Sequence, residues 1–190
     1  MENIGKKQEL LLKIIEFSYI EMPKLPYHNF QHAKEIATAV KLIGQGEKIS
    51  DEDIFLLEVA GYLHDIIYEL GALDNEERSA TKSREFLKSL GCDPHQVNVI
   101  CDLILATKVG NKPRNILEEI ICDADLSNLG TEEYFKKSEQ IRIERGLPDG
   151  KEWQETNKNF LMNHEYYTKT AKRIYGPLLE KNKEIFSKKS

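Results

Sequence analysis

The chain has 190 residues and a formal net charge of −5, and 40% of its residues are hydrophobic. That length and hydrophobic content suit one domain with a single buried core, and the acidic balance excludes the broad basic surface typical of nucleic-acid binders. Since no signal-peptide pattern opens the sequence and no apolar run approaches the roughly 20 residues that span a bilayer, we expect a cytoplasmic protein without a membrane partner.

Apolar residues recur at helical spacing along nearly the whole chain, and no stretch shows the alternation of a strand. We therefore predict an all-α fold, a single-domain helical bundle over residues 1–180, followed by a polar tail over residues 181–190 that frays. The predicted helices, in chain order, span residues 7–20, 29–43, 50–67, 74–90, 94–107, 114–128, 131–145 and 151–175.

Glycine, proline and capping residues set the boundaries of these helices. Gly44 is expected to stop the second helix, and Gly176, which precedes a proline, is expected to stop the last one. Ser50 and Asp74 each begin a helix with an acidic residue three positions later, as in a capping box. Asp93 before a proline is typical of a helix start, because proline fits the first helical position.

Two histidines lie four residues apart where the second predicted helix begins. On a helix, this spacing puts the side chains of His28 and His32 on one face, within about 6 Å of each other at Cβ. Both could therefore reach one pocket. The alternative for either ring is a core or capping histidine that a backbone carbonyl satisfies.

A histidine and an aspartate, His64 and Asp65, lie side by side in the most apolar predicted helix. An ionised carboxylate buried without a partner is costly, so a buried Asp65 needs a cation or a network of hydrogen bonds. A divalent metal ion would satisfy it, and neutral imidazole is a common further ligand. Gly61, one turn earlier, would let a neighbouring helix approach closely, although packing alone also explains a glycine there.

Two further carboxylates, Asp123 and Asp125, interrupt the apolar helix predicted at residues 114–128. A spacing of two residues turns them to different faces of that helix, so we expect only one of them to reach a central site. The spacing does not say which one. Taken in chain order, the polar clusters read His, His-Asp and Asp on three helices.

This arrangement resembles the HD-domain metal-dependent phosphohydrolases, in particular their single-domain members. The resemblance runs from about residue 27 to residue 145 and rests on four ordered segments, which read YHNFQH, HD, NEERSA and DADL. Four such segments in order are far more specific than an HD pair alone. The resemblance implies a helical bundle of the HD-domain type and four metal ligands, which are His32, His64, Asp65 and Asp125. Asp123 is the alternative to Asp125.

The first segment also resembles the cyclic nucleotide phosphodiesterases, in which the histidine of the YHN sequence donates a proton to the leaving oxygen. That resemblance assigns the general-acid role to His28. Those enzymes carry a further histidine three residues after the HD aspartate, where this chain has Tyr68, and the paired histidines of two-metal HD branches are missing. We therefore expect one tightly held metal ion, with any second ion bound only weakly.

The ligand types restrict the metal without naming it. Two imidazoles and two carboxylates suit manganese, iron, nickel, cobalt or zinc, and magnesium is less suited to nitrogen ligands. Glu69, about one turn after Asp65, is a candidate for orienting or deprotonating the attacking water. Alternatively, Glu69 belongs to a solvated last turn of the helix.

Candidate substrate-binding residues come from two patterns. Lys108 and Arg142 interrupt apolar surroundings and could hold phosphate oxygens, with a solvated helix end and a surface ion pair as the respective alternatives. Asn75 and Glu77 belong to the NEERSA segment, which the resemblance places near the site. For Glu77, a capping role is the preferred interpretation.

Several functions fit these observations. The leading one is hydrolysis of a phosphate ester by a metal-activated water, with a small phosphorylated substrate such as a nucleotide. The runner-up is a pyrophosphohydrolase for nucleotides or for the alarmone guanosine tetraphosphate, although alarmone hydrolases carry a Glu-Asp pair where this chain has Tyr68-Glu69. The rivals from other classes are a non-catalytic sensor of metal or nucleotide and a purely structural polar core.

Overall fold

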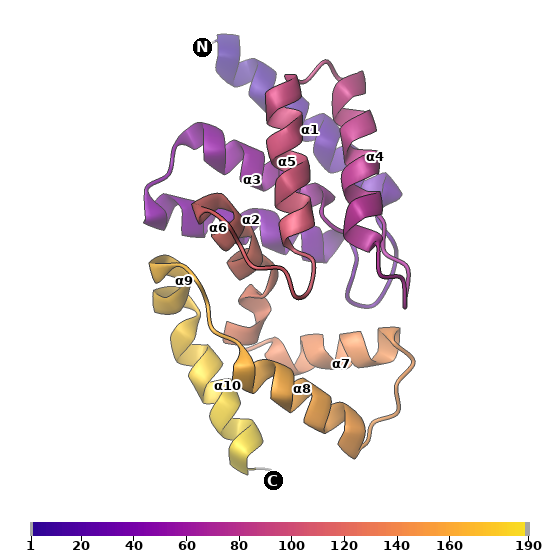
Figure 1. The fold of residues 1–190 in the computed structure, drawn as a ribbon, viewed down its shortest axis with the longest axis vertical. Coiled ribbons are helices and arrows are strands. Elements are labelled where there is room, and N and C mark those ends of the chain that lie inside the picture. Colours follow the sequence, from indigo (N-terminus) through magenta and orange to yellow (C-terminus); the bar gives the residue numbers. More distant parts are fainter. Residues whose placement is uncertain (1, 189–190) are drawn as a thin grey trace.

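The computed structural model describes residues 2–188, which form ten α-helices, one short 3₁₀ helix and no strand (Figure 1). The predicted all-α class is therefore confirmed. None of the described helices combines the length and apolarity needed to cross a bilayer. The helices, in chain order, are α1 (Glu2–Glu21), α2 (Phe30–Glu47), α3 (Asp51–Leu63), α4 (Asn75–Ser89), α5 (Pro94–Ala106), α6 (Ile116–Asp125), η1 (Ser127–Gly130), α7 (Tyr134–Glu144), α8 (Lys151–Asn163), α9 (Lys169–Ile174) and α10 (Gly176–Lys188).

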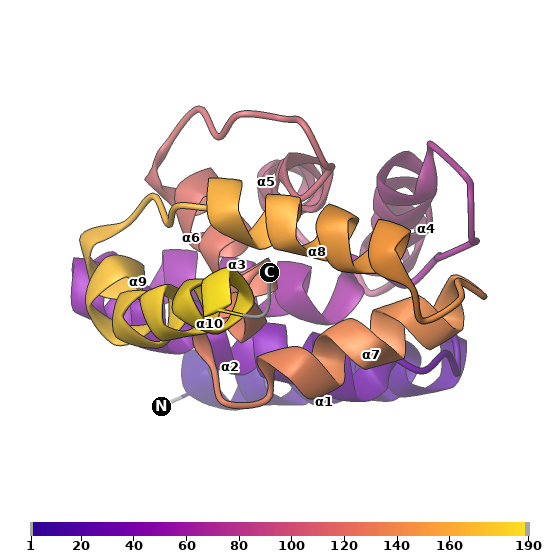
Figure 2. The ribbon, with the colours of Figure 1, turned by 90° about the horizontal axis from the view of Figure 1, so that it is seen from below.

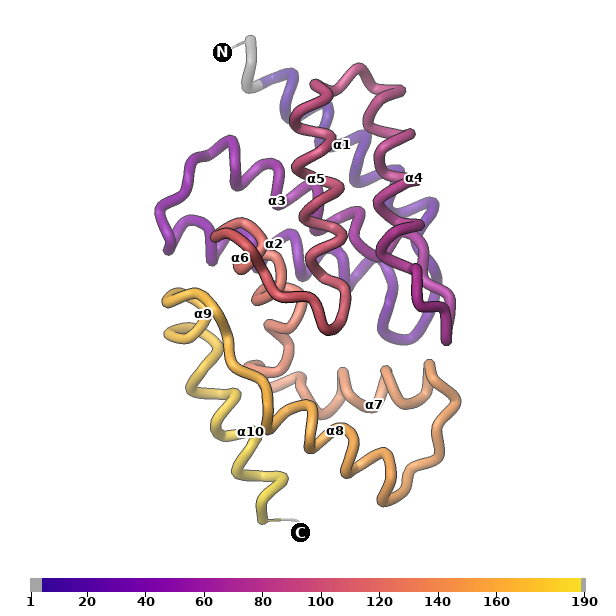
Figure 3. Tube along the Cα trace, in the orientation of Figure 1, coloured from indigo at the N-terminus to yellow at the C-terminus, as the bar shows by residue number. Residues whose placement is uncertain are grey.

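The helices fall into two groups along the long axis of the molecule. Figures 1 and 3 show α1 to α5 gathered in one half and α7, α8 and α10 in the other, with α6 leading from the first to the second. In Figure 2, seen from below, α7, α8 and α10 extend across the end of the first group. Within that group, α2 packs against α3 and α6, and α5 packs against α3 and α4. Buried side chains such as Ile36, Leu57 and Ile104 fill the core between these helices.

The contact between α2 and α3 depends on Gly61. A Cβ atom added at Gly61 would lie only 3.1 Å from the backbone nitrogen of Ala37 in α2. The predicted close approach of a neighbouring helix is therefore confirmed. A larger side chain would push the two helices apart, because a packed interior has no room to absorb extra atoms.

Glycine does not end the second helix as predicted. α2 continues through Gly44 and Gly46, and Lys48 then closes it in the left-handed conformation with a φ of 59°. Both glycines allow close packing instead: an added Cβ at Gly44 would lie 3.1 Å from Ile54, and one at Gly46 would overlap Thr170. A glycine inside a helix costs only about 1 kcal/mol, so tertiary contacts readily override its tendency to stop a helix.

Local capping explains where several helices begin. The side chains of Ser50 and Asp93 accept hydrogen bonds from the first turns of α3 and α5, as predicted. Asp74 precedes α4 but makes no side-chain capping hydrogen bond, so the predicted capping box is wrong. Thr168 caps α9 and thereby divides the helix predicted at residues 151–175 into α8 and α9.

The C-terminal end of the chain also differs from the prediction. Gly176 begins α10 instead of stopping a helix, because Pro177 suits a first helical turn, where its missing N–H group is not needed. Residues 181–188, predicted as a polar tail, continue this helix, and Asn182 is buried within it. Residues 189–190 of the predicted tail lie outside the described residues.

Candidate metal centre

Three helix ends bring the predicted metal ligands together. His32 lies in the first turn of α2, where the Asn29 side chain caps the helix by accepting a hydrogen bond from the His32 backbone N–H. α3 ends one residue before His64, so His64 and Asp65 occupy the turn after this helix, whereas the prediction placed them inside it. Asp125 is the last residue of α6. The ligands therefore meet where their helices begin or end.

We call His32, His64, Asp65 and Asp125 the metal-binding group, after the role that the sequence predicts for them. The Nε2 atoms of His32 and His64 lie 3.2 and 3.5 Å from Oδ1 of Asp125. The same two atoms lie 3.7 and 3.0 Å from Oδ2 of Asp65. One ligand atom from each of His32, His64 and Asp125 lies within 4.8 Å of the other two, which is close enough for a single ion. Residues from three helices thus converge on one point.

The Nε2 atoms of the two imidazoles face the carboxylates without a hydrogen-bond partner. His32 and His64 are 2% and 1% exposed, and Nε2 of each is buried and unpaired. Nδ1 of His64 lies 2.9 Å from the Gly61 carbonyl oxygen and donates its proton there, so Nε2 is the nitrogen that faces the carboxylates. An imidazole nitrogen this close to carboxylate oxygens needs a positive charge, either a proton or a metal ion, between the two. A divalent ion fits this set of nitrogen and oxygen donors.

The pKa values of His64 and Asp125 are shifted because imidazoles and carboxylates lie close together in this group. Burial alone would lower the pKa of His64, but the carboxylates of Asp65 and Asp125 raise it well above its usual value. Burial raises the pKa of Asp125, yet its contacts with His32 and His64 lower it overall. Both carboxylates therefore favour the ionised form, and the site favours a bound positive charge. A metal ion that takes this place would release a proton from the site.

His28 lies beside the metal-binding group and is held in one orientation. Its Nδ1 pairs with Oε1 of Glu144, while Oε2 of Glu144 accepts hydrogen bonds from the backbone N–H groups of Tyr27 and His28, at 2.9 and 3.0 Å. The Tyr68 ring stacks on the imidazole, with centroids 3.5 Å apart and planes 14° apart. These contacts leave Nε2 of His28 facing the group, 4.0 Å from Oδ2 of Asp65.

Glu144 is a site residue that the sequence interpretation missed. Its side chain is 0% exposed. Burial raises the pKa of this carboxyl, but its bonds to His28 lower it overall. The sequence pattern pointed instead to Arg142, two residues earlier in the same helix. No local pattern distinguishes Glu144 from Glu139 in this polar helix, since only the tertiary contacts do so.

Asp123 has a structural role, and Asp125 is the aspartate that reaches the metal-binding group. The carboxylate of Asp123 is buried and accepts 2.8 Å hydrogen bonds from the backbone N–H groups of Tyr167 and Thr168. These bonds tie α6 to the turn before α9. Burial raises the pKa of Asp123. As the spacing predicted, only one of the two aspartates faces the site.

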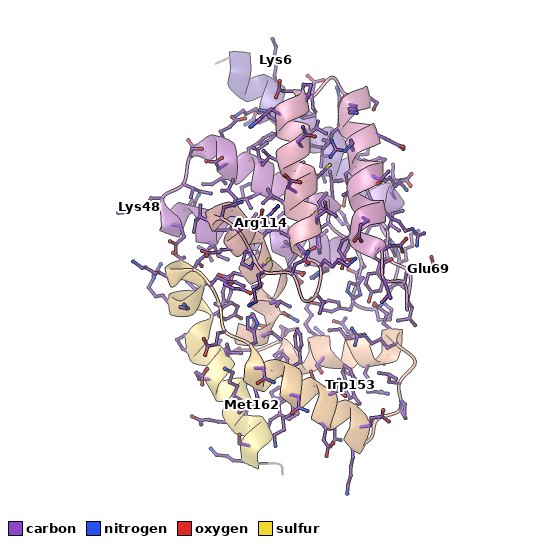
Figure 4. All side chains as sticks on the ribbon, viewed as in Figure 1. Lys6, Lys48, Glu69, Arg114, Trp153 and Met162 are labelled. Carbon is purple, nitrogen blue, oxygen red and sulfur yellow. The ribbon has the colours of Figure 1, made fainter. Side chains whose placement is uncertain are left out.

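The structure does not bring Glu69 or Arg142 to the metal-binding group. Glu69 projects from the edge of the molecule, where its carboxylate accepts a 2.8 Å hydrogen bond from Arg78 (Figure 4). Arg142 donates hydrogen bonds to Glu139 and to the Leu147 carbonyl oxygen. The alternative interpretations, a solvated turn for Glu69 and a surface ion pair for Arg142, agree with the structure.

Asn75, Glu77 and Lys108 lie where the loops around the site meet. Asn75 accepts a 2.9 Å hydrogen bond from the Glu69 N–H and donates a 3.0 Å one to the Glu69 carbonyl, which fixes the loop between α3 and α4. The Lys108 ammonium pairs with Glu77 and donates a 2.8 Å hydrogen bond to the carbonyl oxygen of Leu73. Asn75 and Lys108 therefore lie at the site, but both are already engaged by the chain.

A cavity of about 550 Å³ opens from the metal-binding group, a volume within the range of small-molecule sites. Arg145, at the end of α7, is a second residue that the sequence interpretation missed. Its side chain lines the cavity and hydrogen-bonds Tyr68. The cavity is lined by His28, Asp65, Tyr68, Leu70, Gly71, Ala72, Leu73, Asn75, Glu76, Thr107, Lys108, Val109, Asp125, Arg145 and Leu147.

Comparisons with known proteins agree with this geometry. A family model described as HD domain matches residues 29–127. The crystal structure of the Lin1889 protein from Listeria innocua is similar with a TM-score of 0.72 at 15% identity, over 96% of this chain and 94% of that one. The crystal structure of Bacillus subtilis YpgQ in complex with ADP is similar with a TM-score of 0.67 at 16% identity, over 93% and 91%. At these identities the two structures show the fold alone, and no curated protein matches the chain.

Proposed function

The chain belongs to the HD-domain family, and we propose that it is a metal-dependent phosphohydrolase that cleaves a phosphate ester of a small molecule. One observation carries this proposal: two buried, unpaired imidazole nitrogens face two carboxylates at a cavity large enough for a substrate. Buried polar atoms of a purely structural core are almost always hydrogen-bonded. The unpaired nitrogens therefore favour a ligand site over a structural network.

The four residues of the metal-binding group would hold one divalent ion. Their two imidazoles and two carboxylates suit manganese, iron, nickel, cobalt or zinc better than magnesium. When bound, such an ion activates water for attack and withdraws charge from the phosphoryl oxygens. Tyr68 stands where two-metal relatives carry a histidine, and its ring is engaged in the stack on His28. This supports a single tightly held ion, with any second ion bound weakly.

His28 is the proposed proton donor to the leaving oxygen. Because Glu144 accepts at Nδ1, the ring presents Nε2 to the space beside Asp65. Tyr68 covers one face of the ring and restricts its rotation. General-acid catalysis requires a proton donor that is held within reach of the leaving group. In this scheme His28 is catalytic, and Glu144 is a positioning residue that acts through it.

A nucleotide is one candidate substrate. The YpgQ structure, which has a similar fold, is in complex with ADP. That observation favours a nucleotide phosphohydrolase, and it also keeps a nucleotide or alarmone pyrophosphohydrolase as the second candidate. The product distinguishes the two: a phosphomonoesterase releases inorganic phosphate from nucleoside monophosphates, whereas a pyrophosphohydrolase releases pyrophosphate from guanosine tetraphosphate.

Asp125→Ala tests metal binding and hydrolysis together. The substitution removes the carboxylate that contacts both imidazoles, so we expect stoichiometric metal to be lost. Activity on bis-p-nitrophenyl phosphate should fall at least about a hundredfold, the scale seen when a metal site loses its support. Metal content is measured by mass spectrometry and folding by circular dichroism. Asp102→Ala, which removes an exposed carboxylate of α5, is the matched control.

The outcomes separate the proposal from its rivals. Wild-type metal content and full activity in the Asp125→Ala variant would contradict it. A wild-type chain that retains metal and binds a nucleotide, yet hydrolyses no ester, would support the non-catalytic sensor instead. If the wild-type chain takes up no stoichiometric metal, the polar cluster has a purely structural role.

A further inference from the structure

Large apolar side chains surround the mouth of the cavity. Leu73 and Val109 are 86% and 87% exposed, the highest values among the large hydrophobic residues that the structure describes. Both line the cavity, together with Leu70 and Leu147, which are also exposed. Exposed apolar groups that gather at a site indicate that an apolar ligand or surface covers them. The cavity itself indicates a ligand, since these side chains border the same space as the metal-binding group.

Lys108 holds the two apolar side chains in relation to each other. Leu73 belongs to the loop between α3 and α4, and Val109 belongs to the loop between α5 and α6. The Lys108 ammonium donates a 2.8 Å hydrogen bond to the Leu73 carbonyl oxygen and pairs with Glu77. Because Lys108 directly precedes Val109, this contact joins both loops on one side of the mouth. Because the Lys108 ammonium is used in these contacts, it is not available to bind a phosphate.

The charged residues that line the cavity suit a ligand with one phosphate group better than a polyphosphate. Asp65, Glu76 and Asp125 contribute carboxylates, and the cationic side chains among the described lining residues are Lys108, Arg145 and, when it carries the proton, His28. Lys108 is paired with Glu77 and His28 with Glu144, whereas Arg145 hydrogen-bonds the neutral hydroxyl of Tyr68, so Arg145 is the lining cation that can face a phosphate beyond the metal-binding group. Polyphosphates carry several negative charges and are usually bound by clusters of arginine and lysine. The carboxylate of Glu76 would instead repel a second phosphate.

We propose that the substrate carries a single phosphate group esterified to an apolar or planar substituent, and that Leu73 and Val109 select it by covering that substituent. The phosphate lies at the metal-binding group with Arg145 facing it. This inference rests on the proposed function, which sets the position of the phosphate. It assigns aryl-bearing or base-bearing phosphate esters as good substrates and pyrophosphates as poor ones.

Two phosphonates that cannot be hydrolysed test the inference without turnover. We expect the metal-loaded chain to bind 1-naphthylmethylphosphonate at least about tenfold more tightly than methylphosphonate, measured by isothermal titration calorimetry. The double variant Leu73→Ser/Val109→Ser should reduce that ratio by about tenfold, because it removes the apolar surface under the ring. Leu12→Ser, which removes a leucine that is 66% exposed on α1, should keep the wild-type ratio and is the matched control.

The results separate this inference from the proposed function. It is overturned by a wild-type ratio below about three, by a ratio that the double variant leaves unchanged, or by tighter binding of methylenediphosphonate than of the naphthyl ligand. Each of these results counts against it whether or not the chain hydrolyses esters. Conversely, a naphthyl preference that disappears in the double variant, in a chain that hydrolyses no phosphate ester, would overturn the proposed function alone.

Discussion

The candidate site is assembled from two parts of the chain that differ in what they contribute. The metal-binding group comes from α2, the turn after α3, and α6, all within the 29–127 region that matches the HD domain. Glu144 and Arg145 come from the end of α7, beyond that region. The first part contains the proposed ligands, and the second contributes Glu144, which holds His28, and Arg145, which lines the cavity. We therefore expect metal binding and proton transfer to be separable by mutation.

Hydrogen bonds from side chains to backbone dock the C-terminal helices on the first part. Asp123 in α6 accepts from the backbone N–H of Thr168, and Glu47 in α2 accepts from the backbone N–H of Thr170. In the opposite direction, Asn182 in α10 donates to the carbonyl oxygen of Leu129 in η1. Backbone groups that are buried in such contacts need these partners, so the docking is specific rather than a loose apolar contact.

The largest effect expected from the second part follows from Glu144→Gln. Glutamine keeps the size of the side chain and can still accept from the backbone of Tyr27 and His28, but it no longer presents a carboxylate oxygen to Nδ1 of His28. We expect kcat for alkyl phosphate esters to fall about a thousandfold, within the range of general-acid catalysis, while metal content stays at the wild-type level. Steady-state kinetics and metal analysis of one preparation check both.

The leaving group supplies an internal control for this variant. p-Nitrophenolate departs without a proton, so Glu144→Gln should change its release far less than that of an alkoxide. Glu139→Gln, in the same helix, alters an exposed carboxylate and should leave both rates unchanged. An equal fall for both leaving groups, or loss of metal, would mean that the two parts of the site do not act separately.

A smaller effect, on stability, is expected from Asp123→Ala. The substitution leaves the backbone N–H groups of Tyr167 and Thr168 without their partner, and each unpaired buried group costs about 1–3 kcal/mol. Because burial raises the pKa of Asp123, removing its charge offsets part of this loss. We expect the free energy of unfolding to fall by about 2 kcal/mol in urea titrations, with Asp102→Ala as the control. Loss of metal from a folded Asp123→Ala variant would identify Asp123 as a ligand after all.

The convergence of the four residues in the metal-binding group could be predicted because polar side chains are chemically out of place in apolar sequence. His64, Asp65 and Asp125 interrupt apolar stretches, where a polar or charged side chain needs a partner. Glu144 and Arg145 could not be found in this way, because a charged residue is ordinary in a polar helix. Their roles depend on the contact between α7 and the segment around His28, which no local pattern reveals.

The fold shows the same division between local and tertiary causes. The helix starts at Ser50 and Asp93 were predicted correctly, because each cap needs only hydrogen bonds within its own first turn. Gly44 and Gly176 were interpreted wrongly as stops. Gly44 lies inside α2, where it packs closely against Ile54, and Gly176 precedes a proline that starts α10. Packing against another helix therefore decides the outcome at Gly44, whereas a second local signal, the proline, decides it at Gly176.

The smallest predicted effect depends on pH and belongs to the second part of the molecule. His164 lies between α8 and α9, and its ring packs edge-on against Tyr166 with centroids 4.7 Å apart. Nε2 of His164 is buried without a hydrogen-bond partner. Burial, together with the nearby charge of Lys183, lowers the pKa of His164 from 6.5 to about 4. The fold therefore keeps this ring neutral at pH values where the unfolded chain protonates it.

The sign of the effect follows from this difference in pKa. As the pH falls below 6.5, the unfolded chain binds the proton before the folded chain does, so stability decreases until the pH reaches about 4. We expect His164→Gln to remove about 1 kcal/mol of the stability lost between about pH 7 and pH 5.5, as measured by urea unfolding at both values. The same variant should keep its metal and its preference among leaving groups, because His164 acts on the docking of the C-terminal helices and not on the site. An unchanged pH dependence of unfolding would mean that the ring is not held neutral in the fold. Loss of metal from the variant would mean that the C-terminal helices influence the metal-binding group, contrary to what the geometry indicates.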